Sequence, residues 1–170
     1  MRSPLAIPLG SIRQGETRFS YELEPDELGL SEHEVAENPS FAQLLGRVRV
    51  DVGVVRTGQR LMVAGSVSFR AQLICALCGV EYECVLSELL SAEFLDYDPT
   101  EEPELSTDEV DRVRLRGDLL DLVPLTHDAV HLAVPMAPTC RPDCRGLCPC
   151  CGANLNLTGH DSSCPAGPLQ

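Results

Sequence analysis

Cysteines are the residues of this sequence best suited to chemistry. The chain contains nine of them, and five lie in the segment CRPDCRGLCPCCGANLN, residues 140–156.

The N-terminal residues MRSPLAIPLGSIRQGE lack the apolar core of a secretory signal, and no apolar run reaches the ~18 residues of a membrane span. We therefore expect a cytoplasmic protein, where closely spaced thiols are more often metal ligands or catalytic groups than disulfides. The odd number of cysteines points the same way.

Four pairs of residues have the spacing of metal chelators. They are Cys75 and Cys78, Cys140 and Cys144, Cys148 and Cys151, and His160 and Cys164. A two-residue gap lets a tight turn aim two sulfurs at one ion about 2.3 Å away, and a following glycine lets backbone amides approach the thiolates. Gly79 and Gly152 occupy that following position. The four pairs supply enough ligands for two tetrahedral sites, so we predict two zinc ions per chain.

Chain separation favours one grouping of these pairs. The short loop between Cys151 and His160 costs little entropy to close, which predicts a local site of Cys148, Cys151, His160 and Cys164. The other site then consists of Cys75, Cys78, Cys140 and Cys144, and it would join a turn in the first half of the chain to the tail.

An alternative grouping takes all four ligands of one site from the tail. It places Cys140, Cys144, Cys148 and Cys151 on one ion, and leaves Cys75 and Cys78 reduced or sharing a second ion with the far tail. Cys84 and Cys150 have no role in either grouping. Cys84 lies in a strand pattern, where a free cysteine behaves as a small buried hydrophobe.

Two catalytic chemistries stand as alternatives to metal binding. Cys148-Pro-x-Cys151 has the spacing of the dithiol in a thiol-disulfide oxidoreductase, but the GANLN that follows is a poor helix start. A cysteine hydrolase would need a base such as His33, His127 or His131, yet no nucleophile elbow or oxyanion motif flanks any cysteine. His127 and His131 stand four apart on a predicted helix and could bind metal, although exposed histidines without metal are the commoner case. We expect a non-enzymatic protein without a small-molecule substrate.

Hydrophobic periodicity predicts the elements that position the cysteines. Alternating apolar residues from Val48 to Val54 and again from Leu61 to Val67, around the turn RTGQ, predict a β-hairpin that ends at Cys75. EYECVLSELLSAEFLD predicts a third strand, which puts CALCG in the turn between strands, and RFSYEL predicts a short strand near the N-terminus. An amphipathic helix is predicted to start near Pro124 and to end before Pro135. Its apolar face would consist of Leu125, Ala129, Leu132 and Ala133.

These elements indicate an α+β fold with an antiparallel β-sheet and one packed helix. We expect a core domain over residues 1–137, with a mobile acidic loop at about residues 96–111. Residues 138–170 would form a cysteine-rich, irregular tail that zinc orders and that docks on the core.

Charge narrows the class of partner. The net charge is −13, and every one of the 13 basic residues is arginine. Such a chain repels phosphate at long range, so a basic protein suits it better than nonspecific nucleic acid. Two rows of arginines recur at every second position and could meet RNA phosphates locally, unless nearby acids pair with them. The rows are Arg47 with Arg49, and Arg112 with Arg114 and Arg116.

Three segments occur in a fixed order: CALCG at the end of the predicted hairpin, then DLLDLVPLTHDAVHLAVPMAP, then CRPDCRGLCPCCGANLN. Across about residues 60–157 they resemble the YceD family, the large ribosomal RNA subunit accumulation proteins. The resemblance implies a bacterial or organellar factor in ribosome biogenesis that supports accumulation of large-subunit rRNA and assembly of the large subunit. The family is often encoded beside a small basic zinc-ribbon protein of that subunit, and it offers no catalytic residues to carry over. The implied partner is a basic ribosomal protein of the large subunit, large-subunit rRNA or its precursor, or both. Cys150 departs from the family pattern as an extra thiol.

Overall fold

The computed structural model describes residues 3–30, 41–95, 113–115, 117–157 and 164–165. The predicted acidic loop at about residues 96–111 lies outside the described residues, and so do His33 and His160. The cysteines are all described.

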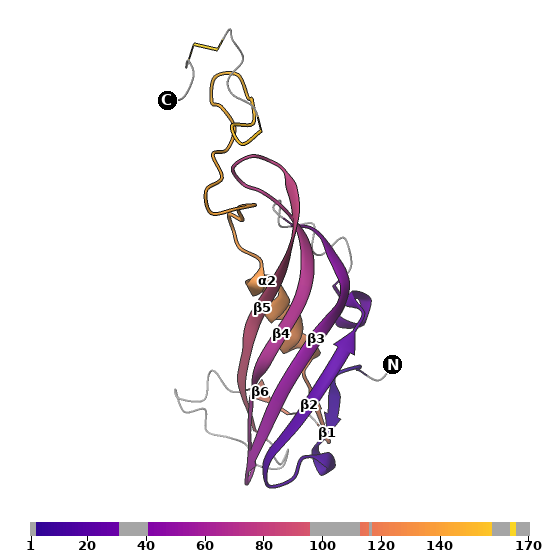
Figure 1. Ribbon diagram of the computed structural model, residues 1–170. Helices are drawn as coiled ribbons and strands as arrows, with labels where there is room; N and C mark the ends of the chain where they lie inside the picture. Colours follow the sequence, from indigo (N-terminus) through magenta and orange to yellow (C-terminus); the bar gives the residue numbers. More distant parts are fainter. Residues whose placement is uncertain (1–2, 31–40, 96–112, 116, 158–163, 166–170) are drawn as a thin grey trace.

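A five-stranded sheet in the order β2-β3-β4-β5-β6 forms the body of the protein (Figure 1). Its strands are β2 (Gly15–Leu23), β3 (Phe41–Thr57), β4 (Arg60–Ile74), β5 (Glu81–Leu95) and β6 (Val113–Arg114). Strands β2 to β5 are antiparallel, and the short β6 pairs in parallel with the end of β5. The sequence thus predicted the hairpin, the third strand and the N-terminal strand correctly.

One face of this sheet is apolar because valines alternate along its central strands. Val48, Val50 and Val54 are fully buried on β3, and Val50 and Val54 lie opposite Val67 and Val63 of β4. Paired residues in antiparallel strands share a face, so these side chains form one continuous surface.

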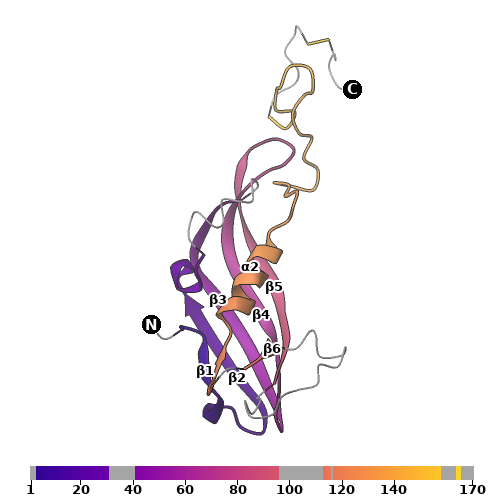
Figure 2. The ribbon, with the colours of Figure 1, turned by 180° about the vertical axis from the view of Figure 1, so that it is seen from behind.

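A second layer covers that apolar face (Figure 2). It contains helix α2 (Val123–Ala133), the small sheet of β1 (Ala6–Pro8) and β7 (Leu119–Asp121), and the 3-10 turns η1 (Leu9–Ser11) and η2 (Pro25–Leu28). Leu5, Ile7, Leu120 and Leu122 are at most 1% exposed, and they close the core from the β1 and β7 side. The result is an α+β fold, as predicted, with one α-helix among the described residues.

The predicted apolar face of α2 is confirmed at Ala129, which is buried, and at Leu125 and Ala133, which pack against the core, but it is wrong at Leu132. Thr126, Ala129 and Val130 are buried, whereas Leu132 is 75% exposed. At roughly 100° per residue, Leu132 lies about a third of a turn from the centre of the buried face, so the apolar stripe was placed too far to one side. None of the described helices has the length and apolar character needed to cross a membrane.

The tail after α2 runs beside the turn between β4 and β5 and continues beyond the end of the sheet (Figures 1 and 2). Ala76 donates a backbone hydrogen bond of 2.8 Å to the carbonyl of Pro138, and Leu147 donates one of 3.1 Å to the carbonyl of Leu77. The tail therefore meets the sheet at the cysteine-bearing turn.

Candidate metal centre

The β4–β5 turn presents Cys75 and Cys78 on a tight loop. The Cys75 amide donates to the Val80 carbonyl at 2.9 Å, and the Gly79 amide donates to the Cys75 carbonyl, also at 2.9 Å. Gly79 has a φ of 71°, in the left-handed region that a side chain disfavours. This glycine lets the chain reverse within the turn, so that both sulfurs lie on its buried side.

The tail brings two further sulfurs to the same place. Cys140 follows the contact between Pro138 and the turn, and the Cys144 amide closes a short turn by donating to the Arg141 carbonyl at 3.2 Å. Both thiols are half-buried. Residues 62 and 69 positions apart in sequence thus become neighbours, as the Cys78–Cys140 and Cys75–Cys144 contacts show.

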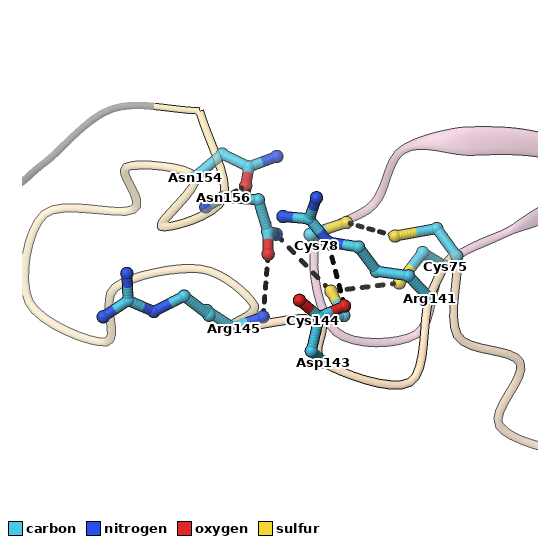
Figure 3. Close-up of polar contacts among 9 residues, drawn as sticks. Cys75, Cys78, Arg141, Asp143, Cys144, Arg145, Asn154 and Asn156 are labelled. Atoms are coloured by element: carbon cyan, nitrogen blue, oxygen red, sulfur yellow. Dashed lines mark hydrogen bonds and ion pairs between the residues drawn. The ribbon is translucent and has the colours of Figure 1, made fainter.

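The four sulfurs have the dimensions of a tetrahedral thiolate site. The Sγ atoms of Cys75, Cys78, Cys140 and Cys144 all lie within 4.8 Å of one another. The Cys75–Cys144 and Cys78–Cys140 sulfur pairs are 3.7 and 3.8 Å apart (Figure 3). Four sulfurs about 2.3 Å from one zinc ion would be separated by about 3.8 Å at the edges of the tetrahedron. The cluster could therefore hold a zinc-sized ion after only small shifts.

Backbone amides make the four thiols unequal. Burial raises the pKa of Cys75, but hydrogen bonds from the amides of Cys140, Cys78 and Leu77 outweigh burial and lower that pKa to about 6. Burial, together with the hydrogen bond to Cys78, raises the pKa of Cys140 to about 12. The surroundings of Cys75 thus favour its thiolate form, whereas those of Cys140 favour its thiol form.

The segment Cys148–Ala153 repeats the turn of Cys75–Val80. The Cys148 amide donates to the Ala153 carbonyl at 2.8 Å, and the Gly152 amide donates to the Cys148 carbonyl at 2.9 Å. Gly152 has a φ of 72°. Hydrogen bonds from the amides of Cys151 and Cys150 lower the pKa of Cys148 to about 6. Two segments with the pattern C-x-x-C-G thus fold in the same way.

A second sulfur cluster surrounds this repeat. The Sγ atoms of Cys148, Cys150 and Cys164 lie within 4.8 Å of one another, and the Cys148–Cys164 sulfur distance is 3.7 Å. Cys151 is exposed, and its sulfur is not one of the three in this cluster. Ligand spacing gives Cys150 no role, yet its sulfur lies in this cluster. Its position directly before Cys151 in CPCC was the one available clue.

Asparagines of the segment GANLN connect the two clusters. The Asn156 Nδ2 atom donates to the Cys144 Sγ at 3.4 Å, while its Oδ1 accepts from the Arg145 amide at 2.8 Å (Figure 3). The Asn154 Oδ1 accepts from both the amide and the Nδ2 of Asn156, at 3.0 and 2.8 Å. Because Asn154 also bridges to Leu147, the loop that carries Cys148 is fastened against the first cluster.

The other candidate residues lie outside these clusters. Arg47 forms an ion pair with Glu24 at 2.7 Å, and Arg49 forms one with Asp51 at 2.8 Å. Both arginines of this predicted row are therefore paired with nearby acids. Arg112 and Arg116 lie outside the described residues. Cys84 packs half-buried against the core. The Nε2 atoms of His127 and His131 lie 3.3 Å apart on α2.

Comparison with known proteins finds relatives in mycobacteria and in maize. Uncharacterised proteins of Mycobacterium tuberculosis and Mycobacterium bovis are each 34% identical to this chain over 112 residues, which is 65% of this chain and 53% of theirs. A maize protein called large ribosomal RNA subunit accumulation protein YCED homolog 1, chloroplastic, is 43% identical over 49 residues, 29% of this chain and 16% of the maize protein. The chain thus spans about half the length of the mycobacterial relatives. No solved structure matches.

The family assignment covers both cysteine clusters. Residues 63–166 match the family described as "Large ribosomal RNA subunit accumulation protein YceD". This range extends from β4 to beyond Cys164 and makes up more than half of the chain. The chain belongs to the YceD family.

Proposed function

We propose that this protein is a non-enzymatic factor in the biogenesis of the large ribosomal subunit. The observation that carries the proposal is the match of residues 63–166 to a family described by large ribosomal RNA accumulation. In this role the chain acts in the cytoplasm and holds a basic ribosomal protein of the large subunit, large-subunit rRNA or both.

Charge favours the protein partner. The net charge of −13 attracts a basic ribosomal protein and repels rRNA at long range. Arg47 and Arg49 form ion pairs with Glu24 and Asp51. These acids offset the positive charge of one of the two arginine rows that could have met RNA phosphates. An acidic factor of this kind would shield a basic protein until its rRNA site is ready.

Two zinc ions would give the tail its shape. We assign one ion to Cys75, Cys78, Cys140 and Cys144, whose sulfur spacing suits a tetrahedron. We assign the other to Cys148, Cys151, His160 and Cys164, because the Cys148 turn repeats the Cys75 turn. Cys150 is the competing ligand at this second site. Each ion would fix chain segments that have few core residues of their own.

Depletion tests the proposed role. Cells depleted of the protein should contain less large-subunit rRNA and a smaller large-subunit peak in a sucrose gradient. The protein itself should co-sediment with precursors of that subunit and not with the small subunit. Unchanged subunit profiles after depletion would contradict the proposal.

One observation favours a second function. The lowered pKa of Cys148, beside Cys151, is a property of thiol-disulfide oxidoreductases. However, the cause is a turn that Cys75 shares, and no helix among the described residues follows Cys151. Anaerobically purified protein with about two zinc ions and few titratable thiols would exclude a free dithiol, whereas metal-free protein that reduces an insulin disulfide would support the oxidoreductase.

A further inference from the structure

One edge of strand β5 is unpaired with any described strand along most of its length. Its other edge is joined to β4 from Glu81 to Leu95. On the open side, β6 pairs only with Phe94 and Leu95. Residues 81–93 therefore present backbone groups at the margin of the sheet. This surface is called the β5 edge below.

The hydrogen bonds identify which backbone groups point outward. The Leu89 amide donates a hydrogen bond of 3.0 Å to the Oε1 atom of the preceding residue, Glu88, so this amide points away from β4. The Leu95 carbonyl accepts from Leu115, also on the open side. In an antiparallel ladder, N–H and C=O of one residue point the same way and the direction alternates. Between residues 83 and 91, the residues whose backbone faces outward are thus Glu83, Val85, Ser87, Leu89 and Ser91.

Proteins usually block such an edge. Proline, a bulge or an exposed lysine prevents another chain from pairing with it. Residues 81–93 contain no proline and no lysine, and the β4–β5 register runs without a shift. Among the described residues, the Glu88 carboxylate is the one side chain with a hydrogen bond to an outward amide of this edge. A cation on a partner would compete for this carboxylate and free the amide.

Side chains on the β5 edge indicate what would pair with it. Val85 and Leu89 are 71% and 78% exposed on the face of the sheet that α2 does not cover. β5 carries four glutamates and no basic residue. The opposite edge strand, β2, has Arg18 already paired with Glu16 at 2.6 Å. Acidic charge along an apolar, hydrogen-bonding edge is complementary to an extended basic segment and repels a second copy of itself.

We propose that the β5 edge binds an extended, arginine- or lysine-rich segment of a protein partner as an added antiparallel strand. The partner's backbone pairs with the outward groups of residues 83–91. Its apolar residues, on one face of the added strand, cover Val85 and Leu89, and its basic residues, on the other face, lie near Glu88. This inference rests on the proposed function in that it takes the partner to be a basic protein.

A defined peptide tests the β5 edge. The probe is a nine-residue peptide of alternating arginine and valine, and its control is the same peptide N-methylated at every backbone amide, which keeps the charge but cannot donate. Zinc-loaded protein should bind the first and not the second. On binding, amide exchange should slow at the outward residues of β5. If both peptides bound equally, charge alone would account for the binding, and the proposal would be overturned.

Ser87→Pro removes an outward amide that β4 does not use, and Ser87→Ala is its matched control. We expect Ser87→Pro to weaken peptide binding about tenfold, the loss of one or two hydrogen bonds. Leu89→Ser should also weaken binding, whereas Met62→Ser, elsewhere on the same exposed face, should not. Leu89→Ser keeps the test valid if proline unfolds the strand. Unchanged binding by folded Leu89→Ser and Ser87→Pro, or dimerisation through β5 without peptide, would overturn the proposal.

Expressing the Ser87→Pro variant in depleted cells distinguishes a failure of this inference from a failure of the proposed function. If depletion changes subunit profiles and Ser87→Pro restores them fully, the β5 edge is wrong and the ribosomal role stands. If depletion changes nothing, the ribosomal role fails whatever the peptide does.

Discussion

The side-chain amide of Asn156 lies 3.4 Å from the sulfur of Cys144 and donates a hydrogen bond to it. The same amide group caps the Arg145 backbone through its oxygen, so Asn156 holds the loop of the second cluster against the first. An N–H donor stabilises a thiolate, and groups behind the metal ligands commonly orient them.

Replacing Asn156 should therefore loosen the first metal site. We expect Asn156→Asp to weaken zinc binding by about 10–100-fold, because it loses the donor and places a carboxylate beside a thiolate. Transfer of zinc to a chromophoric chelator under reducing conditions measures the effect. Leu157→Ala, at an exposed neighbour, is the control. Equal release rates for both variants would show that Asn156 does not support the site.

The two clusters should lose their ions separately. Cys75→Ser removes a sulfur of the first cluster and Cys148→Ser one of the second, so each variant should retain about one zinc ion by elemental analysis. Cys84→Ser, outside both clusters, should retain both. If either cluster variant lost both ions, the sites would share a ligand or fold as one unit.

Neighbouring cysteines compete for the second site, and the repeated turn favours Cys151. In the first turn the sulfurs of Cys75 and Cys78 both join the cluster, and Cys151 occupies the position equivalent to Cys78. Cys151→Ser should therefore lower zinc content at the second site more than Cys150→Ser does. Cobalt substitution followed by thiolate charge-transfer absorption counts the sulfurs. The reverse order of the two variants would make Cys150 the ligand.

Local patterns predicted the strands and turns because those patterns are short-range. Valine alternation fixes which face of β3 is buried, and C-x-x-C-G fixes a turn through one glycine. The grouping of Cys75 with Cys144 was inferred from loop lengths, and the contact itself depends on how the tail leaves α2. Spacing alone treated Cys150 as a bystander, because a one-residue gap says nothing about where a third segment, here Cys164, will lie.

The open edge of β5 could not be predicted from its sequence. An edge and a central strand share the same alternation, and only the length of β6 shows which side stays unpaired. The error on α2 has a similar origin. Leu132 is as apolar as the buried residues, and the direction from which the sheet meets the helix decides which side is covered.

A buried hydroxyl in α2 offers a test of the core that is independent of metal. Thr126 is fully buried, and its Oγ1 has no hydrogen-bond partner among the described residues. Thr126→Val keeps the shape and removes the unsatisfied hydroxyl, so it should raise the free energy of unfolding by about 1 kcal/mol. Thr126→Ser keeps the hydroxyl and loses a methyl group, so it should lower that free energy by about 1 kcal/mol. Urea unfolding of the zinc-loaded protein, followed by circular dichroism, gives both values. A destabilised Thr126→Val would mean that the hydroxyl has a partner, and that the packing of α2 on the sheet depends on it.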